Sequence, residues 1–284
     1  MAHATTAVTN PSRISRRFAD LRSAGEMGLV TYITAGDPSL AATEQFVLAL
    51  ANAGADVIEL GVPFSDPVAD GPVIQRASER ALQAGTTLAG VLALVKSLRA
   101  KTDVPLVLFS YYNPVLQMGL EKFGDAAKVA GADGVLITDV TPEEGVEYRE
   151  AMNSRGLDTI FLAAPTSTDE RLALIAKSSS GFLYLISRTG VTGAKDQLAE
   201  ELPSLARRVR RVTELPIAVG FGISLPGHVS VLGGLADAAV VGSALVEEIE
   251  RAATVEAAAH ALAARVKLLK GAAVAGMSRR EPNP

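Results

Sequence analysis

Two carboxylates lie in an unusual segment rich in proline and glycine, residues 59–72. Glu59 ends an otherwise apolar run, where scarce water should raise its pKa and suit it to both giving and taking a proton. Asp70 lies eleven positions later, and a second carboxylate in a different environment can stay ionised. The pair predicts acid–base chemistry with divided roles. Asp66, in the same segment, is more simply a turn residue.

Both carboxylates also have a structural interpretation. Glu59 paired with a buried arginine, or Asp70 capping a helix that begins near Gly71, would need no catalytic role, and composition alone leaves both interpretations open. Cysteine is absent, which excludes disulfides and thiolate sites, and the three histidines are too far apart in sequence to show metal-ligand spacing. We therefore expect no metal site.

Three glycine-bearing segments late in the chain predict an anion site. They cover residues 187–194, 220–224 and 242–244, and each follows an apolar run. Glycine lets backbone N–H groups approach a ligand closely, and a helix that begins at Ser243 points its dipole at an anion. The pattern indicates a seat for a phosphate group, with plain turn glycines as the alternative.

Apolar and aromatic residues end most of the other apolar runs. Together they predict a pocket for a flat aromatic body, although each alone is more often an ordinary core residue. These residues are Tyr32, Phe109, Tyr111, Leu136, Leu162, Tyr184 and Phe221.

Eight short apolar runs rich in β-branched residues are typical of strands buried on both faces of a parallel sheet. Longer amphipathic segments alternate with them and predict helices. The expected strands are residues 29–34, 57–60, 104–109, 135–138, 159–163, 182–186, 217–219 and 238–241. The expected helices are residues 41–53, 88–99, 143–154, 170–177, 203–212 and 255–270.

This alternation predicts an α/β protein, and eight units favour a (β/α)8 TIM barrel over a doubly wound sheet. The sequence Ala-Gly-Ala-Asp occurs at 53–56 and again at 130–133, each time ahead of an expected strand, and Leu-Ala-Asp at 235–237 has the same place. An extra N-terminal helix within residues 11–25 is expected to close the barrel bottom. We expect one barrel domain over residues 1–284, with flexible tails at 1–11 and 276–284.

Composition narrows the function classes. The chain has 27 basic and 31 acidic residues, a net charge of −4, which argues against nucleic-acid binding through phosphates. Apolar residues make up 48 %, enough for a large core, but no apolar run reaches the ~18 residues of a membrane span. No signal peptide is visible and cysteine is absent, so we expect a cytoplasmic protein. The predicted pocket and anion site indicate a small-molecule ligand.

Residues 59–72, Glu-Leu-Gly-Val-Pro-Phe-Ser-Asp-Pro-Val-Ala-Asp-Gly-Pro, closely resemble the signature of the tryptophan synthase α subunit family. Residues 34–38, 187–193, 220–224 and 242–244 also match that family in the right order, and the likeness covers roughly residues 12–270. The resemblance implies a (β/α)8 lyase of tryptophan biosynthesis. Its reaction is the retro-aldol cleavage of indole-3-glycerol phosphate to indole and glyceraldehyde 3-phosphate.

The same resemblance implies residue roles. Glu59 would protonate C3 of the indole and then take the hydroxyl proton of the glycerol chain, while Asp70 would interact with the indole N–H. Thr192 would order Asp70 on loop closure. Protonation at C3 makes the ring an electron sink, so the reaction needs neither a metal nor a Schiff-base lysine. The implied phosphate ligands are Gly193, Gly222, Gly242 and Ser243.

Family members work with a β subunit that carries pyridoxal phosphate, in an αββα heterotetramer in which indole passes internally between the sites. The resemblance therefore implies no cofactor in this chain and a β subunit as its partner. It places the loop with Pro63 and Asp66 against that partner.

Two rival functions remain. One is a related barrel enzyme for another phosphorylated metabolite, such as a synthase that forms indole-glycerol phosphate or a phosphoribosyl isomerase. The synthase should need a lysine at a strand end, and the isomerase would not be expected to carry the proline-rich loop. The other is a non-catalytic partner that only gates a β-type subunit, against which the presence of both Glu59 and Asp70 argues.

Overall fold

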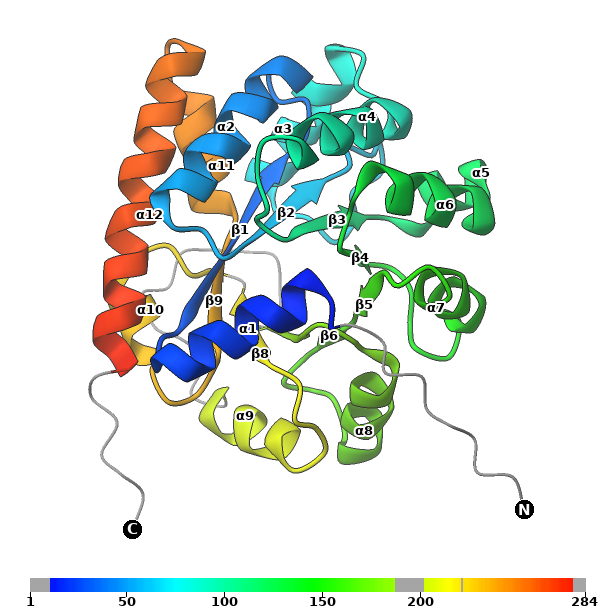
Figure 1. Cartoon of the computed structure of the whole chain (residues 1–284), viewed down its shortest axis with the longest axis vertical. Helices are drawn as coiled ribbons and strands as arrows, with labels where there is room; N and C mark the ends of the chain where they lie inside the picture. Colours follow the sequence, from blue (N-terminus) through cyan, green and yellow to red (C-terminus); the bar gives the residue numbers. More distant parts are fainter. Residues whose placement is uncertain (1–10, 187–201, 221, 278–284) are drawn as a thin grey trace.

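Parallel strands form the frame of this molecule (Figure 1). The computed structural model describes residues 11–186, 202–220 and 222–277. Its strands are β1 (Gly28–Thr34), β2 (Val57–Gly61), β3 (Leu106–Ser110), β4 (Gly134–Ile137), β5 (Asp158–Ile160), β6 (Leu162–Ala163), β7 (Leu183–Ile186), β8 (Ile217–Gly220) and β9 (Ala238–Val241). They form one sheet in the order β5-β4-β3-β2-β1-β9-β8-β7-β6.

The two ends of this order, β5 and β6, are separated in the chain only by Phe161. The Phe161 carbonyl accepts a hydrogen bond from the N–H of Tyr184 at 3.3 Å. The two segments are therefore halves of one barrel strand, which pairs with β4 through β5 and with β7 through β6. The sheet closes into an eight-stranded ring, which confirms the predicted (β/α)8 barrel and each of its eight expected strands.

Helices surround the ring (Figure 1). In the described residues they are α1 (Arg13–Ala24), α2 (Leu40–Ala53), α3 (Pro72–Gln83), α4 (Leu88–Arg99), α5 (Tyr112–Met118), α6 (Leu120–Ala130), α7 (Val146–Asn153), α8 (Asp169–Ser178), α9 (Leu202–Arg210), α10 (Pro226–Val231), α11 (Ser243–Arg251) and α12 (Val255–Met277). No single helix of the described chain is long and apolar enough to cross a membrane. One bent pair, α3 with α4, passes that test by length and composition.

Two of these helices extend the sequence prediction. Helix α3 follows the proline-rich segment directly, with Pro72 at its first position, where proline needs no hydrogen-bonded N–H. Residues 1–10 and 278–284 of the expected tails lie outside the described residues, but helix α12 continues to Met277 and so includes the first two residues of the expected tail at 276–284. The physical reason is burial, because Ala272 and Ala273 pack into the outer core.

Successive residues of each strand face opposite sides of the ring, which produces two apolar cores. Leu29 and Ile33 of β1 face outward and pack in the core between ring and helices. Val30 and Tyr32 of the same strand face inward, with inward residues of the other strands. Helix α1 closes one end of the inner core, where Phe18 lies with its ring centroid 5.7 Å from that of Phe182. The expected N-terminal helix is therefore confirmed.

Three aspartates, of which Asp56 and Asp133 are buried and Asp237 is partly buried, explain the short repeats of the sequence. Asp56, Asp133 and Asp237 each directly precede a strand, namely β2, β4 and β9. Each carboxylate accepts a hydrogen bond from the backbone N–H at or next to the start of a neighbouring strand; the donors are Leu29, Leu106 and Ile217. Each also pairs with a basic side chain. The repeated aspartate thus joins neighbouring strands at the closed end of the barrel.

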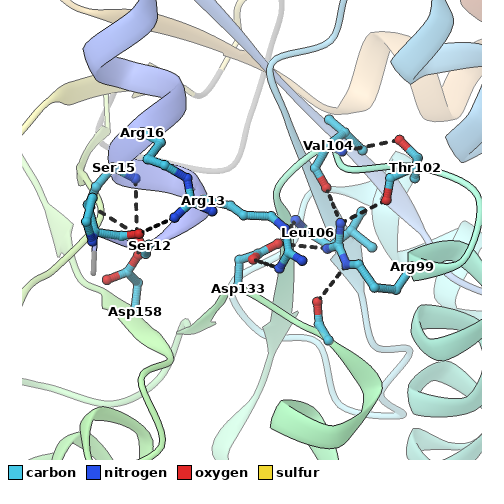
Figure 2. Close-up of polar contacts among 12 residues, drawn as sticks. Ser12, Arg13, Ser15, Arg16, Arg99, Thr102, Val104, Leu106, Asp133 and Asp158 are labelled. Carbon is cyan, nitrogen blue, oxygen red and sulfur yellow. Dashed lines mark hydrogen bonds and ion pairs between the residues drawn. The ribbon is translucent and has the colours of Figure 1, made fainter. Parts of the chain in front are cut away.

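The cluster around Asp133 shows how these contacts join helices to strands (Figure 2). Its carboxylate accepts from Arg13 of α1 at 2.9 Å, from Arg99 of α4 at 2.8 Å and from the N–H of Leu106 at 2.9 Å. Beside it, the Ser12 hydroxyl donates to Asp158 at 2.5 Å. One side chain therefore ties α1, α4 and β3 together at the barrel bottom.

We expect Asp133→Ala to lower the free energy of unfolding by about 3 kcal/mol, because it leaves two arginines and a backbone N–H without their shared acceptor. Urea unfolding measures this loss. Asp125→Ala is the matched control, since Asp125 also pairs with an arginine but is 68 % exposed, and it should cost less than about 1 kcal/mol. Equal losses for the two variants would show that the cluster does not fasten the barrel.

Candidate active site

Glu59 is an acidic residue buried inside the apolar ring, and it forms no ion pair with the described residues. It lies on β2 beside Tyr32 of β1 and Val107 of β3 in the strand register, and its side chain is fully buried. Neither carboxylate oxygen has a hydrogen-bond partner among the described residues. Burial raises the pKa of Glu59 to about 8. None of the described arginines pairs with Glu59, which speaks against the structural interpretation, and the group holds a proton at neutral pH.

Asp70 occupies a less extreme environment at the end of the loop between β2 and α3. Burial raises its pKa to about 6, while a hydrogen bond from the Tyr111 hydroxyl opposes that rise. The first residue before α3 is Gly71, and no side chain caps this helix. The interpretation that Asp70 is a helix cap is therefore also wrong. At neutral pH Asp70 is mostly ionised, whereas Glu59 is mostly protonated.

Two tyrosines connect the carboxylates electrostatically. Burial raises the pKa of Tyr32 well above its usual value, and the charges of Asp70 and Glu59 add to that rise. Burial likewise raises the pKa of Tyr184, with a further contribution from Glu59. Both phenols therefore stay protonated and lie close enough to Glu59 to feel its charge. The two carboxylates share one site lined by neutral hydroxyls.

The predicted aromatic pocket is assembled from strands around the ring. Tyr32 and Phe109 meet edge to face, with ring centroids 5.1 Å apart. Tyr32, Phe109, Leu136 and Tyr184 all belong to the inner core, and Leu162 packs against it. Tyr111 lies just beyond β3 and contacts Phe64 of the proline-rich loop instead. Phe221 lies outside the described residues.

Sequence reasoning missed two glycines that shape this pocket. A Cβ atom on Gly61 would lie 2.1 Å from the Tyr32 hydroxyl, and one on Gly220 would lie 2.3 Å from the Tyr184 hydroxyl. Each glycine stands two residues beyond the register partner of its tyrosine, so the arrangement is the same on β2 and on β8. The sequence did contain a signal for these contacts. Each glycine ends its strand, and the neighbouring strand carries an inward-facing tyrosine.

Two of the three predicted phosphate segments are described. Gly222 follows β8 with a φ of +86°, and Gly242 directly precedes α11. Because β8 and β9 are paired neighbours, these segments leave the same end of the ring. Helix α11 begins at Ser243 without a side-chain cap, so its first N–H groups are not used by a capping side chain. Thr192 and Gly193 lie outside the described residues.

The two residues expected at the partner are placed differently. The side chain of Asp66 is exposed, whereas Pro63 is buried. Asp66 lines a cavity of about 600 Å³ between the proline-rich loop and α3, with Phe64, Pro67 and Val68 of the loop. The apolar side chain of Val68 is 70 % exposed there. Elsewhere, no cluster of three or more His, Asp or Glu within the described ranges has the arrangement of a metal site.

The site therefore combines a protonated buried carboxyl and an ionised carboxylate with an aromatic pocket and with glycines at one end of the ring. Residues 18–274 match the family model described as tryptophan synthase alpha chain. The chain belongs to the tryptophan synthase alpha chain family.

Individual members of the tryptophan synthase alpha chain family agree with this match. The chain is 55 % identical to the tryptophan synthase alpha chain of Solibacter usitatus over 240 residues, covering 84 % of this chain and 90 % of the relative. It is 53 % identical to that of Geobacter sp. strain M21 over the same shares.

Solved structures agree as well. The chain is similar to tryptophan synthase of Mycobacterium tuberculosis, with a TM-score of 0.85 and 35 % identity, covering 93 % of this chain and 99 % of that chain. It is also similar to tryptophan synthase subunit alpha of Legionella pneumophila, with a TM-score of 0.83 and 36 % identity, covering 93 % and 98 % of the two chains.

Membership in the tryptophan synthase alpha chain family confirms the family inferred from residues 59–72. It carries the lyase activity of tryptophan biosynthesis, the cleavage of indole-3-glycerol phosphate. The rival barrel enzymes, which belong to other families, are thereby set aside.

Proposed function

We propose that Glu59 and Asp70 divide the cleavage of indole-3-glycerol phosphate between them. The observation that carries this proposal is the buried Glu59 carboxyl without a partner, beside an aspartate that stays ionised. An apolar environment keeps a proton on Glu59 at neutral pH, so the group is ready to act as a general acid. Few structural explanations exist for an unpaired buried carboxyl, because burying it costs stability.

In the first step the Glu59 carboxyl gives its proton to C3 of the indole ring. The ring becomes a cation with an iminium-like C=N bond, and the ionised Asp70 accepts a hydrogen bond from the ring N–H and stabilises that charge. Asp70 would lose this capacity if protonated. Its lower pKa, about 6 against about 8 for Glu59, fits the assigned role.

In the second step the Glu59 carboxylate takes the proton of the glycerol hydroxyl next to the bond that breaks. The hydroxyl oxygen becomes the carbonyl of glyceraldehyde 3-phosphate, and the electrons of the broken C–C bond return to the ring to form indole. Glu59 ends the cycle protonated, as it began. Proton and electron balance therefore needs no other group, and the aromatic pocket around Tyr32 and Phe109 holds the ring.

The substrate phosphate is assigned to the glycine-lined end of the ring. Gly222, Gly242 and Ser243 offer backbone N–H groups there, and the N-terminus of α11 favours an anion. Gly193 is proposed as a further ligand and Thr192 as the residue that fixes Asp70 when its loop closes, both from the family resemblance.

We infer a β subunit as the partner, with pyridoxal phosphate bound in that subunit. The Legionella protein is named a subunit alpha, which implies a second subunit for that protein. The exposed Asp66, the exposed Val68 and the cavity beside them offer a surface for this partner. The αββα assembly and the cytoplasmic location stay predictions.

The test is indole release from indole-3-glycerol phosphate by the purified chain, with and without a β subunit. We expect slow release that the partner accelerates, because binding at the loop shifts the population toward the closed form. A folded chain that binds substrate but releases no indole under either condition would support the gating function instead.

We expect kcat/KM for indole release to depend on pH as a bell. Asp70 must be ionised, so activity falls as the pH drops below about 6, and Glu59 must start protonated, so activity falls as the pH rises above about 8. Initial rates between pH 5 and pH 9.5 measure both limbs. A rate that rises steadily to pH 9.5 would contradict the acid role of Glu59.

A further inference from the structure

We propose that the Tyr111 hydroxyl positions the Asp70 carboxylate for the reaction, a role distinct from lining the substrate pocket. The proposal rests on the function proposed for Asp70. It makes Tyr111 a positioning residue, which acts through another side chain and not on the substrate.

Tyr111 fastens the proline-rich loop to the end of β3 at two points. It lies one residue beyond β3 and is 3 % exposed. Its hydroxyl oxygen accepts a hydrogen bond from the N–H of Ala69, 42 positions away in sequence, at 3.0 Å. Its ring contacts that of Phe64, with centroids 5.2 Å apart. Ala69 directly precedes Asp70, so the hydroxyl is fixed next to the carboxylate.

The direction of the phenol proton follows from the Ala69 contact. A backbone N–H can only donate, so it occupies a lone pair of the Tyr111 oxygen and leaves the single O–H proton for another acceptor. Two side chains, Asp70 and Thr138, act on the pKa of Tyr111 through hydrogen bonds. A carboxylate can only accept, so we assign the phenol proton to Asp70, and this hydrogen bond lowers the pKa of Asp70 against the effect of burial. Tyr111 therefore both orients the carboxylate and favours its ionised form.

The main chain of Asp70 is held by other contacts. Its N–H donates to the Pro67 carbonyl at 3.0 Å, and its carbonyl accepts from the Gln75 side-chain amide at 2.9 Å. These contacts fix the backbone and leave the orientation of the carboxylate to its own partners. Removing the Tyr111 hydroxyl should therefore disturb the carboxylate without unfolding the loop.

The charged and titratable neighbours of Asp70 single out Tyr111. Tyr32 on β1 faces Asp70 and has its own pKa raised by the carboxylate charge, so it stays a neutral phenol. Glu59 on β2 also raises the pKa of Tyr32 and is itself protonated at neutral pH. Of the described groups that shift the pKa of Asp70, Tyr111 is the one that lowers it. A change at Tyr111 should thus appear in the titration of Asp70.

Tyr111→Phe is the test, with Tyr112→Phe as the matched control on the next residue. We expect the acid limb of kcat/KM to move up by about one pH unit, which lowers activity about 5-fold at pH 6 and less than 2-fold at pH 8. Carboxyl carbon NMR should show the same upward shift for Asp70, and the amide hydrogen of Ala69 should exchange faster. Tyr112→Phe should change none of these.

Each outcome decides one question. An unchanged Asp70 titration in Tyr111→Phe, or an activity loss equal at every pH, overturns the positioning role even if the wild-type chain cleaves substrate normally. Conversely, a wild-type chain that does not release indole overturns the proposed function, while the carboxyl titration and the amide exchange still show whether Tyr111 holds Asp70. Melting temperatures of both variants confirm that each is folded.

Discussion

Glu59→Gln is expected to lower indole release by at least about 1,000-fold, because an amide can neither give a proton to C3 nor take one from the hydroxyl. The substitution keeps the shape of a side chain that is fully buried and makes no hydrogen bond among the described residues, so it breaks no contact on which the fold depends. Single-turnover measurement of indole formation gives the chemical step directly.

The same variant should have a higher free energy of unfolding than the wild type, but only at pH values above about 4.5. The folded-state pKa of Glu59 is about 8 against 4.5 for an ordinary glutamate, so the folded chain binds the extra proton between these values and loses stability as the pH rises. At pH 7 this costs the wild type about 3 kcal/mol, which Gln avoids. Below pH 4.5 both forms are neutral and the difference should vanish.

Glu147→Gln is the matched control for both effects, because Glu147 is an exposed residue of α7. It should leave turnover and melting temperature unchanged across this pH range. Normal turnover by Glu59→Gln at an unchanged melting temperature would remove Glu59 from the mechanism. Lost turnover without the pH-dependent gain in stability would mean that the carboxyl is not held protonated.

Asp70→Asn should reduce kcat/KM by about 100- to 1,000-fold, since it removes the negative charge that stabilises the cationic ring. The loss should be smaller than for Glu59→Gln, because proton transfer to C3 remains possible. A neutral amide does not titrate, so the limb of the pH profile near 6 should disappear while the limb near 8 stays. Rates measured from pH 5 to pH 9.5 separate these two features.

Asp66→Asn tests whether any charge in the loop would produce this result. Asp66 lies in the same loop but is exposed, and the isolated chain should keep its activity within 2-fold. An acid limb that persists in Asp70→Asn would assign that limb to another group. A 100-fold loss in Asp66→Asn without a partner would show that the loop as a whole, and not Asp70, sets the rate.

The strands could be predicted because both of their faces are buried, so that each strand is a continuous run of apolar residues in the sequence. The same cause explains the one subdivision: the run at 159–163 is a single strand whose neighbour changes at Phe161. Helices α5 and α6 escaped prediction because Gly119, with a φ of +89°, divides them into segments of seven and eleven residues. Short segments bounded by glycine resemble loops.

The carboxylates could also be named from sequence, because their loop has an unusual composition. Their environment could not. Whether Glu59 had a partner depended on which arginines reach the inside of the ring, and Arg99 and Arg80 instead pair with Asp133 and Asp37. The contact of Tyr111 with Ala69 spans 42 positions and has no local signal. Only closure of the barrel brings such residues together.

The fit of two phenols against two glycines restricts how this pocket can evolve. A methyl group on Gly61 would meet not only the Tyr32 oxygen but also the ring carbon that carries it, at 2.6 Å, so removing the hydroxyl alone makes too little room. Gly220 and Tyr184 have the same relation, at 2.7 Å. Whether the glycine can be replaced therefore depends on which residue stands at the tyrosine position. In a lineage or a designed library, a larger residue at the glycine becomes accessible only after its tyrosine has been replaced by a smaller side chain.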